Sequence, residues 1–374
     1  MASLQQFRDY QLARRDKQIH SPDDILNDAL KSNAPLMKRM LKGKSAYQVV
    51  QSGDRIVAHI QLTDSGTAGW YTPNDTASPT MTSTMRGVAV NWRFLRAFKA
   101  RTEQEIMLAS GDDATRFFNL RKQGKQEMYT SMLNTFQSSL WAEASTADME
   151  SDGGTKPYSI QMFVNTGVDT VHQLLANYTT TVGANTALVQ TLNPALNANY
   201  RNQTTTYSAS DPGDQYNGIV AGFDTMWHKV RFASPGTKKE YETEEKYQKQ
   251  CIFTNLEGRT KYIQFTRGNN DRMANVGAFT AEVDYSGIPV EYESELDTAT
   301  GILGTTATTI PTGRPVYFWL NLDFLFPVFH SKKYMDMKII DGGPDQPETF
   351  VEWSFLWCNL ICISRRRQGI VYAA

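Results

Sequence analysis

The sequence predicts an α+β fold, because it combines a long amphipathic helix over residues 114–141 and a second one over 216–231 with β-rich runs from Cys251 onward. Its 374 residues allow a substantial buried core and suggest two or three domains. Hydrophobic residues make up 40% of the chain and charged residues 21%, which excludes an intrinsically disordered or membrane-embedded protein.

Charge and cysteine content restrict the function classes further. The 38 Lys and Arg residues against 39 Asp and Glu residues give a net charge of −1, which removes a global basic field for binding nucleic acid. The longest apolar runs, 324–329 and 360–363, fall short of the roughly 18 residues of a membrane span, and we expect no secretory signal at the N-terminus. Three cysteines, an odd number, indicate reduced thiols made in a cytosol.

The first 45 residues carry many charges and few large apolar side chains. Nine Lys and Arg and five Asp and Glu lie within the first 44 positions, and Pro22 and Pro35 interrupt the helical patches. Two interpretations stay open, a frayed terminus or an arm that orders only against a partner.

Residues 46–100 predict an extended two-stranded excursion. Branched residues alternate with polar ones up to Leu62, turn-forming residues dominate 63–85, and extended structure resumes at Gly87. Two strands alone are marginally stable in water, and the Trp70-Tyr71 pair near the tip would be poorly hydrated. We therefore expect Trp70 and Tyr71 to dock elsewhere.

The helix over 114–141 has its apolar or small residues spaced three or four apart, with Asp112 or Asp113 as the predicted N-cap. These positions are Leu120, Gly124, Met128, Met132, Phe136 and Leu140. At 1.5 Å per residue the helix would be about 42 Å long. With one apolar face, it predicts a spine lying on the rest of the fold.

The remaining elements complete the α+β pattern. The helix over 216–231 carries Ile219, Phe223 and Met226 on one face. Short β-rich runs are predicted after it, and a terminal strand is expected within 350–372. The β-rich runs cover 251–255, 261–265, 290–292 and 316–320.

A search for catalytic and metal sites finds no candidate. The sequence has no Gly-rich phosphate loop and no GxSxG motif, and its five histidines are scattered. Cys358 and Cys362 share a strand face without a nearby histidine, which favours bystander thiols. The calcium-loop-like run from Asp148 has Ser159 where a bidentate Glu is required. We predict no catalytic, cofactor-binding or metal-binding residue, and therefore no enzyme.

The triplet Arg365, Arg366 and Arg367 has three interpretations. It could cap a terminal strand, clamp carboxylates of a neighbouring chain, or contact nucleic acid, the last being disfavoured on a neutral protein.

The order of these parts resembles the major capsid proteins of tailed bacteriophages, the HK97-like fold. The segments that carry the resemblance span most of the chain: 66–71, 105–111, 193–202, 287–290, 317–323 and 357–369.

The resemblance implies a domain for every part of the chain. The implied parts are an N-terminal arm (1–45), an extended loop or E-loop hairpin (46–100), a P-domain with the spine helix (101–165), an A-domain (166–260), return strands of the P-domain with A-domain loops (261–345), and a C-terminal A-domain strand (346–374).

The resemblance also implies a function: a structural subunit that self-assembles through hexamers and pentamers into an icosahedral shell around phage double-stranded DNA. Trp70, Tyr71, Arg365, Arg366 and Arg367 are the implied inter-subunit contacts. The other implied partners are a separate scaffolding protein, a portal, a cement or decoration protein and non-specifically contacted DNA, with no membrane. The implied location is the virion, after synthesis in the bacterial cytoplasm.

One departure from the family concerns its covalent cross-link, which in the founding member joins an E-loop lysine to a neighbour's asparagine. No lysine lies between Ser45 and Phe98 here, so we expect a non-covalent shell. Two rival functions remain, the shell of a cellular nanocompartment with the same fold and a cytosolic hydrolase with a site built from dispersed Asp and His.

Overall fold

The computed structural model divides the chain into two compact units, which are described separately below. Unit 1 contains Leu95–Phe136 and Lys333–Leu356 together with Met1–Ser32, and unit 2 contains the rest of the chain. Elements α4, β4 and β12 each contribute residues to both units. The described residues are 35–41, 47–51, 53–61, 70, 84–102, 120–142, 154–164, 192, 200–208, 210, 212–213, 218–231, 249–268, 283–299, 314–341 and 349–373.

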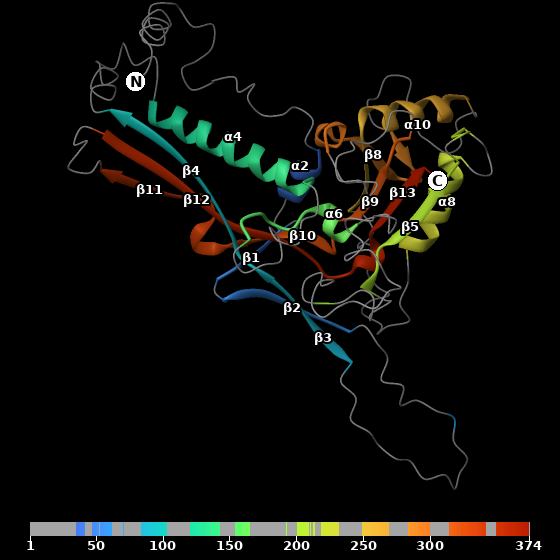
Figure 1. Ribbon diagram of the computed structural model, residues 1–374, viewed down its shortest axis with the longest axis horizontal. Coiled ribbons are helices and arrows are strands. Elements are labelled where there is room, and N and C mark those ends of the chain that lie inside the picture. The colour runs from blue at the N-terminus through green and yellow to red at the C-terminus, as the bar shows by residue number, and fades with distance from the viewer. Residues whose placement is uncertain are drawn as a thin grey trace, which may run out of the picture. The chain divides into compact units, whose positions relative to one another are not determined.

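A six-stranded mixed sheet with the order β5-β13-β9-β6-β8-β7 organises unit 2 (Figure 1). Strand β13 pairs in parallel with β5 and antiparallel with β9, which brings the end of the chain beside two segments distant in sequence. The strands are β5 (Gln203–Tyr207), β6 (Gln250–Thr254), β7 (Asp284–Tyr285), β8 (Ile288–Tyr292), β9 (Tyr317–Asn321) and β13 (Gly369–Ala373).

The core of unit 2 forms around helix α8 (Ile219–Val230), which confirms the amphipathic helix predicted over 216–231. The Phe223 ring is fully buried, with its centroid 4.9 Å from Tyr317, 5.2 Å from Tyr262 and 5.4 Å from both Tyr285 and Trp319. Helix and sheet therefore close an aromatic core within a single chain.

Helix α10 (Leu256–Gly268) corrects the sequence prediction of a strand over 261–265. Its start is capped twice: the Asn255 side-chain oxygen accepts a hydrogen bond from the Gly258 amide at 2.9 Å, and Asp297 accepts one from Leu256 at 3.1 Å. The β-forming side chains Tyr262 and Ile263 instead pack on the core of unit 2. Capping and tertiary packing outweigh their β propensity here.

Unit 2 contains further strands outside the six-stranded sheet, among them the two strands of the hairpin. Strands β2 (Arg55–Gln61) and β3 (Met85–Asn91) form the predicted two-stranded ladder, with Ile56 opposite Val90. Strand β10 (Leu325–His330) lies between β1 (Gln48–Val50) and the last part of β12 (Thr349–Cys362). Unit 2 also contains α2 (Pro35–Leu41), α6 (Ile160–Phe163) and the 3₁₀ turns η4 (Ser294–Asp297) and η6 (Arg365–Arg367).

Unit 1 consists of helix α4 (Leu120–Leu140) up to Phe136 and a sheet formed by β4 (Arg93–Thr102), β11 (Asp336–Asp341) and the first part of β12. The 3₁₀ turn η5 (Ser331–Lys333) precedes β11. Gly124, Met128, Met132 and Phe136 are buried, and so is Leu140 beyond the boundary of unit 1, which confirms the predicted apolar face of the spine helix from Gly124 onward. The side chain of Leu120 lies outside those that the structure describes. The predicted start of this helix, 114–119, lies outside the described residues. No helix within the described ranges has the length and apolarity to cross a membrane.

Candidate assembly surfaces

The hairpin β2–β3 has one buried and one open face. Ile56, Ile60, Val88 and Val90 are at most 8% exposed, whereas Val57 on the other face is 55% exposed. This alternation follows from the two-residue period of strands.

Beyond the strands of the hairpin, Trp70 exposes its entire side chain, with 106% relative exposure. An indole without apolar cover is poorly hydrated, as expected of a docking residue. Tyr71, its predicted companion, lies outside the described residues.

Arg365 lies inside its own subunit, not on the surface expected of an interface charge. Its side chain is 0% exposed, and its Nε donates to the Phe163 carbonyl at 2.9 Å. Its terminal nitrogens reach the Tyr200 carbonyl at 3.5 Å and the Asn202 side-chain oxygen at 3.4 Å. The planar guanidinium thus ties three chain segments together, a role for which its five donors suit it.

Arg366 and Arg367 are half-buried in the same turn η6. The Arg367 guanidinium lies 4.3 Å from the centre of the Phe324 ring, which is a cation–π contact. Of the triplet, these two residues alone retain solvent exposure.

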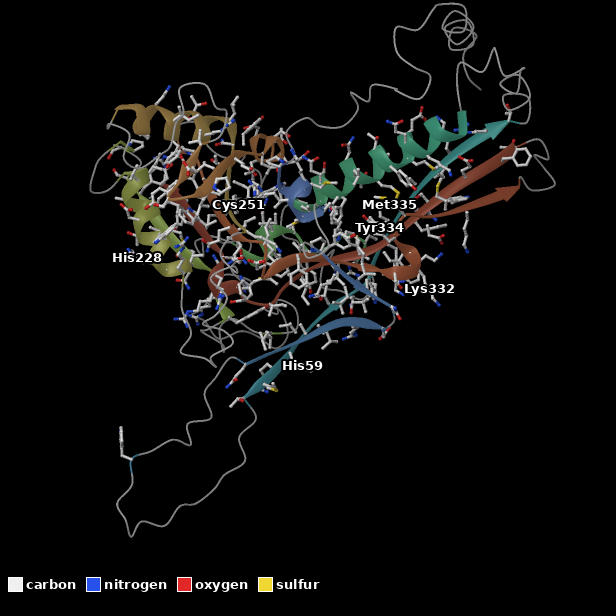
Figure 2. All side chains as sticks on the ribbon, turned by 180° about the vertical axis from the view of Figure 1, so that it is seen from behind. His59, His228, Cys251, Lys332, Tyr334 and Met335 are labelled. Carbon is white, nitrogen blue, oxygen red and sulfur yellow. The ribbon has the colours of Figure 1, made fainter. Side chains whose placement is uncertain are left out.

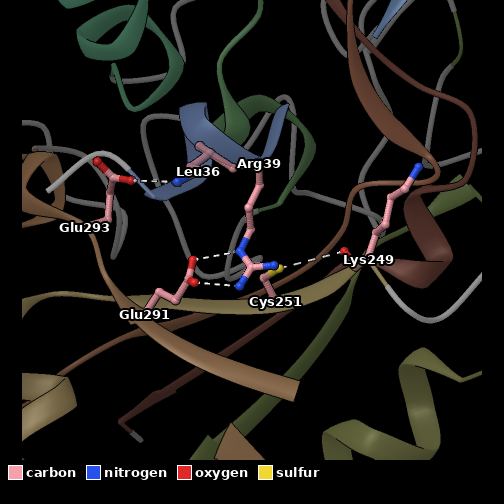
Figure 3. A network of polar contacts seen from close by, with 6 residues as sticks. All are labelled: Leu36, Arg39, Lys249, Cys251, Glu291 and Glu293. Atoms are coloured by element: carbon pink, nitrogen blue, oxygen red, sulfur yellow. Dashed lines mark hydrogen bonds and ion pairs between the residues drawn. The ribbon is translucent and has the colours of Figure 1, made fainter. Parts of the chain in front are cut away.

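Helix α2 is fixed to the rest of unit 2 by an ion pair and by apolar burial (Figure 3). Arg39 bonds Glu291 in a bidentate manner, with Nη2 to Oε1 at 2.6 Å and Nε to Oε2 at 2.9 Å. Leu36, Met37 and Met40 are at most 6% exposed. Fork-to-carboxylate pairing adds directional specificity to the packing.

Glu293 is buried beside this ion pair, and no Lys or Arg among the described residues pairs with it. Its carboxylate accepts hydrogen bonds from the Leu36 amide at 3.3 Å and from the Gln137 side chain at 3.0 Å. Burial raises the pKa of the Glu293 carboxyl to about 7, against the lowering effect of these two donors. The sequence contains Glu291, Glu293 and Glu295 at alternate positions, but nothing in it indicates that helix α2 covers one of them.

Within the part of the chain that the structure describes, thiols and histidines do not gather into a reactive site. His59 lies on β2, His228 on α8 and Cys251 on β6, three separate elements of unit 2 (Figure 2). Burial raises the pKa values of Cys251, Cys358 and Cys362 to about 12, so all three stay protonated at neutral pH. Within the described residues, no three His, Cys, Asp or Glu side chains are placed to hold a metal ion.

Comparison with known proteins gives no match by sequence. No protein-family model matches the chain, and no curated protein matches it.

Solved structures, by contrast, match over nearly the whole chain. A chain from the cyanophage A-1(L) capsid aligns with a TM-score of 0.60 and 11% identity, covering 96% of this chain and 98% of that one. A chain from the capsid of a native GTA particle aligns with a TM-score of 0.53 and 12% identity, covering 96% and 95%. At such identities the likeness establishes the fold, and the α+β fold predicted from the sequence is confirmed as the fold of phage capsid chains.

Proposed function

We propose that this chain is a major capsid protein, a structural subunit that self-assembles through hexamers and pentamers into an icosahedral shell enclosing double-stranded DNA in a virion. The observation that supports it best is the fold shared over 96% of the chain with the cyanophage A-1(L) capsid chain. The alignment also covers 98% of the capsid chain, so the likeness is one of whole folds and not of a shared fragment.

The molecule also carries features that suit assembly. The fully exposed Trp70 indole lowers the solubility of a single subunit. Burying it against a neighbour in a lattice would stabilise the contact by roughly 25 cal/mol per Å² of apolar surface. Repetition over many copies makes weak individual contacts sufficient. We assign Trp70 and Tyr71 to this contact, with Arg366 and Arg367 as further interface charges.

Electron microscopy and light scattering of the purified protein test the proposal. We expect capsomer-sized rings from the protein alone and closed shells when a scaffolding protein is co-expressed. A monodisperse monomer that persists with crowding agents and a co-expressed scaffolding protein would contradict it and favour the hydrolase.

The contents of the shells separate a virion from a nanocompartment. Particles from infected cells should contain nuclease-protected double-stranded DNA, together with a portal. A shell filled with one protein cargo and lacking DNA would identify the nanocompartment instead. Shells that form without any other protein would contradict the expected need for a separate scaffold. Shells that keep their stability after every minor protein is removed would contradict a cement protein.

Substitution of Trp70 tests the hairpin contact. Trp70→Ala should reduce shell yield at least fivefold, because it removes the exposed indole, while the unfolding midpoint of the free subunit stays unchanged. The matched control is Trp70→Phe, which keeps an aromatic ring and should retain most of the yield. Equal shell yields for all three proteins would exclude Trp70 from the interface.

A further inference from the structure

The sheet of unit 1 buries its polar side beneath helix α4. Arg101 is 8% exposed, Glu352 7% and Ser354 0%. The Arg101 guanidinium lies so close to α4 that a Cβ atom at Gly124 would come within 1.8 Å of its Nη2. The Tyr129 hydroxyl of the same helix contacts the Met337 sulfur of β11 at 3.7 Å. Helix α4 therefore covers the side of the sheet that carries these polar residues.

The opposite side of this sheet carries aromatic rings and cations, and we name it the aromatic face, defined by Arg96, Phe98, Lys338, Trp353 and Phe355. The ring centroids of Phe98 and Trp353 lie 5.2 Å apart. The Trp353 ring is nearly parallel to that of Phe355, with an interplanar angle of 8° and a centroid distance of 6.2 Å. The Arg96 guanidinium lies 5.6 Å from the Trp353 ring centre. Lys338 is the direct cross-strand partner of Trp353, so both side chains share one face.

The aromatic face is open to solvent in the single chain. Phe98 exposes 64% of its surface, and Trp353 and Phe355 are half-buried. Next to the face, Lys333 is paired with Asp336 at 2.5 Å, so this lysine is neutralised. Among the described residues, no carboxylate pairs with Arg96 or Lys338. The face thus presents apolar surface with two uncompensated positive charges.

These properties determine the chemistry of an occupant. A second aromatic face packed on the first would bring Arg96 and Lys338 against the same cations, which like-charge repulsion disfavours. A complementary occupant is a short segment with apolar side chains and negative charge. Such a segment suits this face because its apolar side chains can pack on the rings while its carboxylates pair with the neighbouring cations.

The chain itself contains a segment of this composition at residues 22–30. It carries Asp23, Asp24 and Asp28, and it has no lysine or arginine. Four apolar residues accompany them, namely Ile25, Leu26, Ala29 and Leu30. We propose that the aromatic face of one copy binds residues 22–30 of a second copy, an inference that rests on the proposed function because a lattice supplies the second copy.

Cysteine cross-linking between differently tagged copies tests the contact. One copy carries Ala100→Cys, next to Phe98 on the exposed side of β4, and the other carries Asn27→Cys in the acidic segment. After co-assembly and mild oxidation, we expect disulfide-linked pairs of the two tags, at least tenfold above a control that pairs Ala100→Cys with Ser3→Cys. The native cysteines are buried and do not compete.

Two results of the cross-linking would overturn the proposal. One is equal yield with the Ser3→Cys control. The other is a link that forms only within a doubly substituted chain diluted into unmodified protein, since the segment would then bind its own copy. If shells form in either case, the proposed function stands and the inference alone fails. If neither shells nor links form, both fail.

Charge exchange gives an independent readout. Lys338→Glu should lower the cross-link yield at least fivefold, and combining it with Asp24→Lys in the partner copy should restore most of it. Lys38→Glu, which alters an exposed lysine of α2, is the matched control and should change nothing. Failure of every acidic-to-lysine exchange at 23, 24 and 28 to restore the link would overturn the pairing. So would Phe98-dependent binding of a fluorescent single-stranded oligonucleotide, because the face would then hold nucleic acid.

Discussion

Two phenylalanine rings, Phe223 in unit 2 and Phe98 in unit 1, differ in their exposure to solvent. Phe223 is fully buried among four aromatic rings, whereas Phe98 exposes 64% of its surface beside Trp353. Unit 2 completes its core within one chain. Unit 1 covers one side of its sheet with a helix and leaves the aromatic side open. The Phe223 cluster therefore contributes to the stability of the free subunit, whereas the aromatic face of unit 1 leaves apolar surface uncovered.

The largest effect on stability is expected from truncating Phe223, and truncating Phe98 is the matching comparison. Phe223→Ala should lower the free energy of unfolding by about 3–5 kcal/mol, because it leaves a cavity inside an aromatic cluster. Phe98→Ala should change the stability of the free subunit by less than about 1 kcal/mol. Denaturant titration of the two variants measures both. Similar losses for both would show that the exposed ring is already packed in the free subunit.

Arg365 tests whether unit 2 also satisfies its buried charges internally. Arg365→Ala should destabilise the free subunit by about 3–4 kcal/mol, because it leaves the Phe163 and Tyr200 carbonyls and the Asn202 side chain without their donor. Thermal and denaturant unfolding measure the loss. Arg366→Ala in the same turn is the control and should cost much less. Normal stability with impaired assembly would instead return Arg365 to the interface.

Glu293 is a carboxyl group of unit 2 that burial keeps from ionising at its ordinary pH, and the stability of the protein should therefore depend on pH. Its pKa is raised from 4.5 to about 7 in the folded protein, so the folded state holds this proton more tightly than the unfolded state. The stabilisation is fully present below pH 4.5 and is lost as the pH rises through 7. The change amounts to at most about 3 kcal/mol.

Comparison with Glu293→Gln isolates this titration from that of all other groups. The stability of the native protein relative to this variant should fall between pH 4.5 and 7 and stay level above it. Proteolytic cleavage near α2 should follow the same curve, because Leu36 bonds the carboxylate. Parallel pH profiles of the two proteins would show that Glu293 is ionised throughout.

Periodic patterns proved to be the reliable part of the sequence. The spine helix and α8 were predictable because their buried residues recur every three or four positions, as with Met128 and Met132. The hairpin was predictable from two alternating runs separated by turn-forming residues.

Features set by distant partners were not predictable. Three adjacent arginines suggest a surface patch. Arg365 is buried instead because its guanidinium bonds acceptors more than 160 residues away in sequence, among them the Phe163 and Tyr200 carbonyls. Helix α2 likewise depends on Glu291, some 250 residues downstream of Arg39. Helix α10 was misassigned because its aromatic and branched residues resemble a strand until its caps are known.

The buried thiols give the protein a practical property as a labelling scaffold. Cys251, Cys358 and Cys362 are buried with pKa values raised to about 12, so maleimides and iodoacetamides should leave the native fold unmodified. A single cysteine introduced at an exposed position would then be the one reactive handle per subunit. Fluorophores, gold clusters or peptides could be attached at a defined stoichiometry without first replacing any native cysteine.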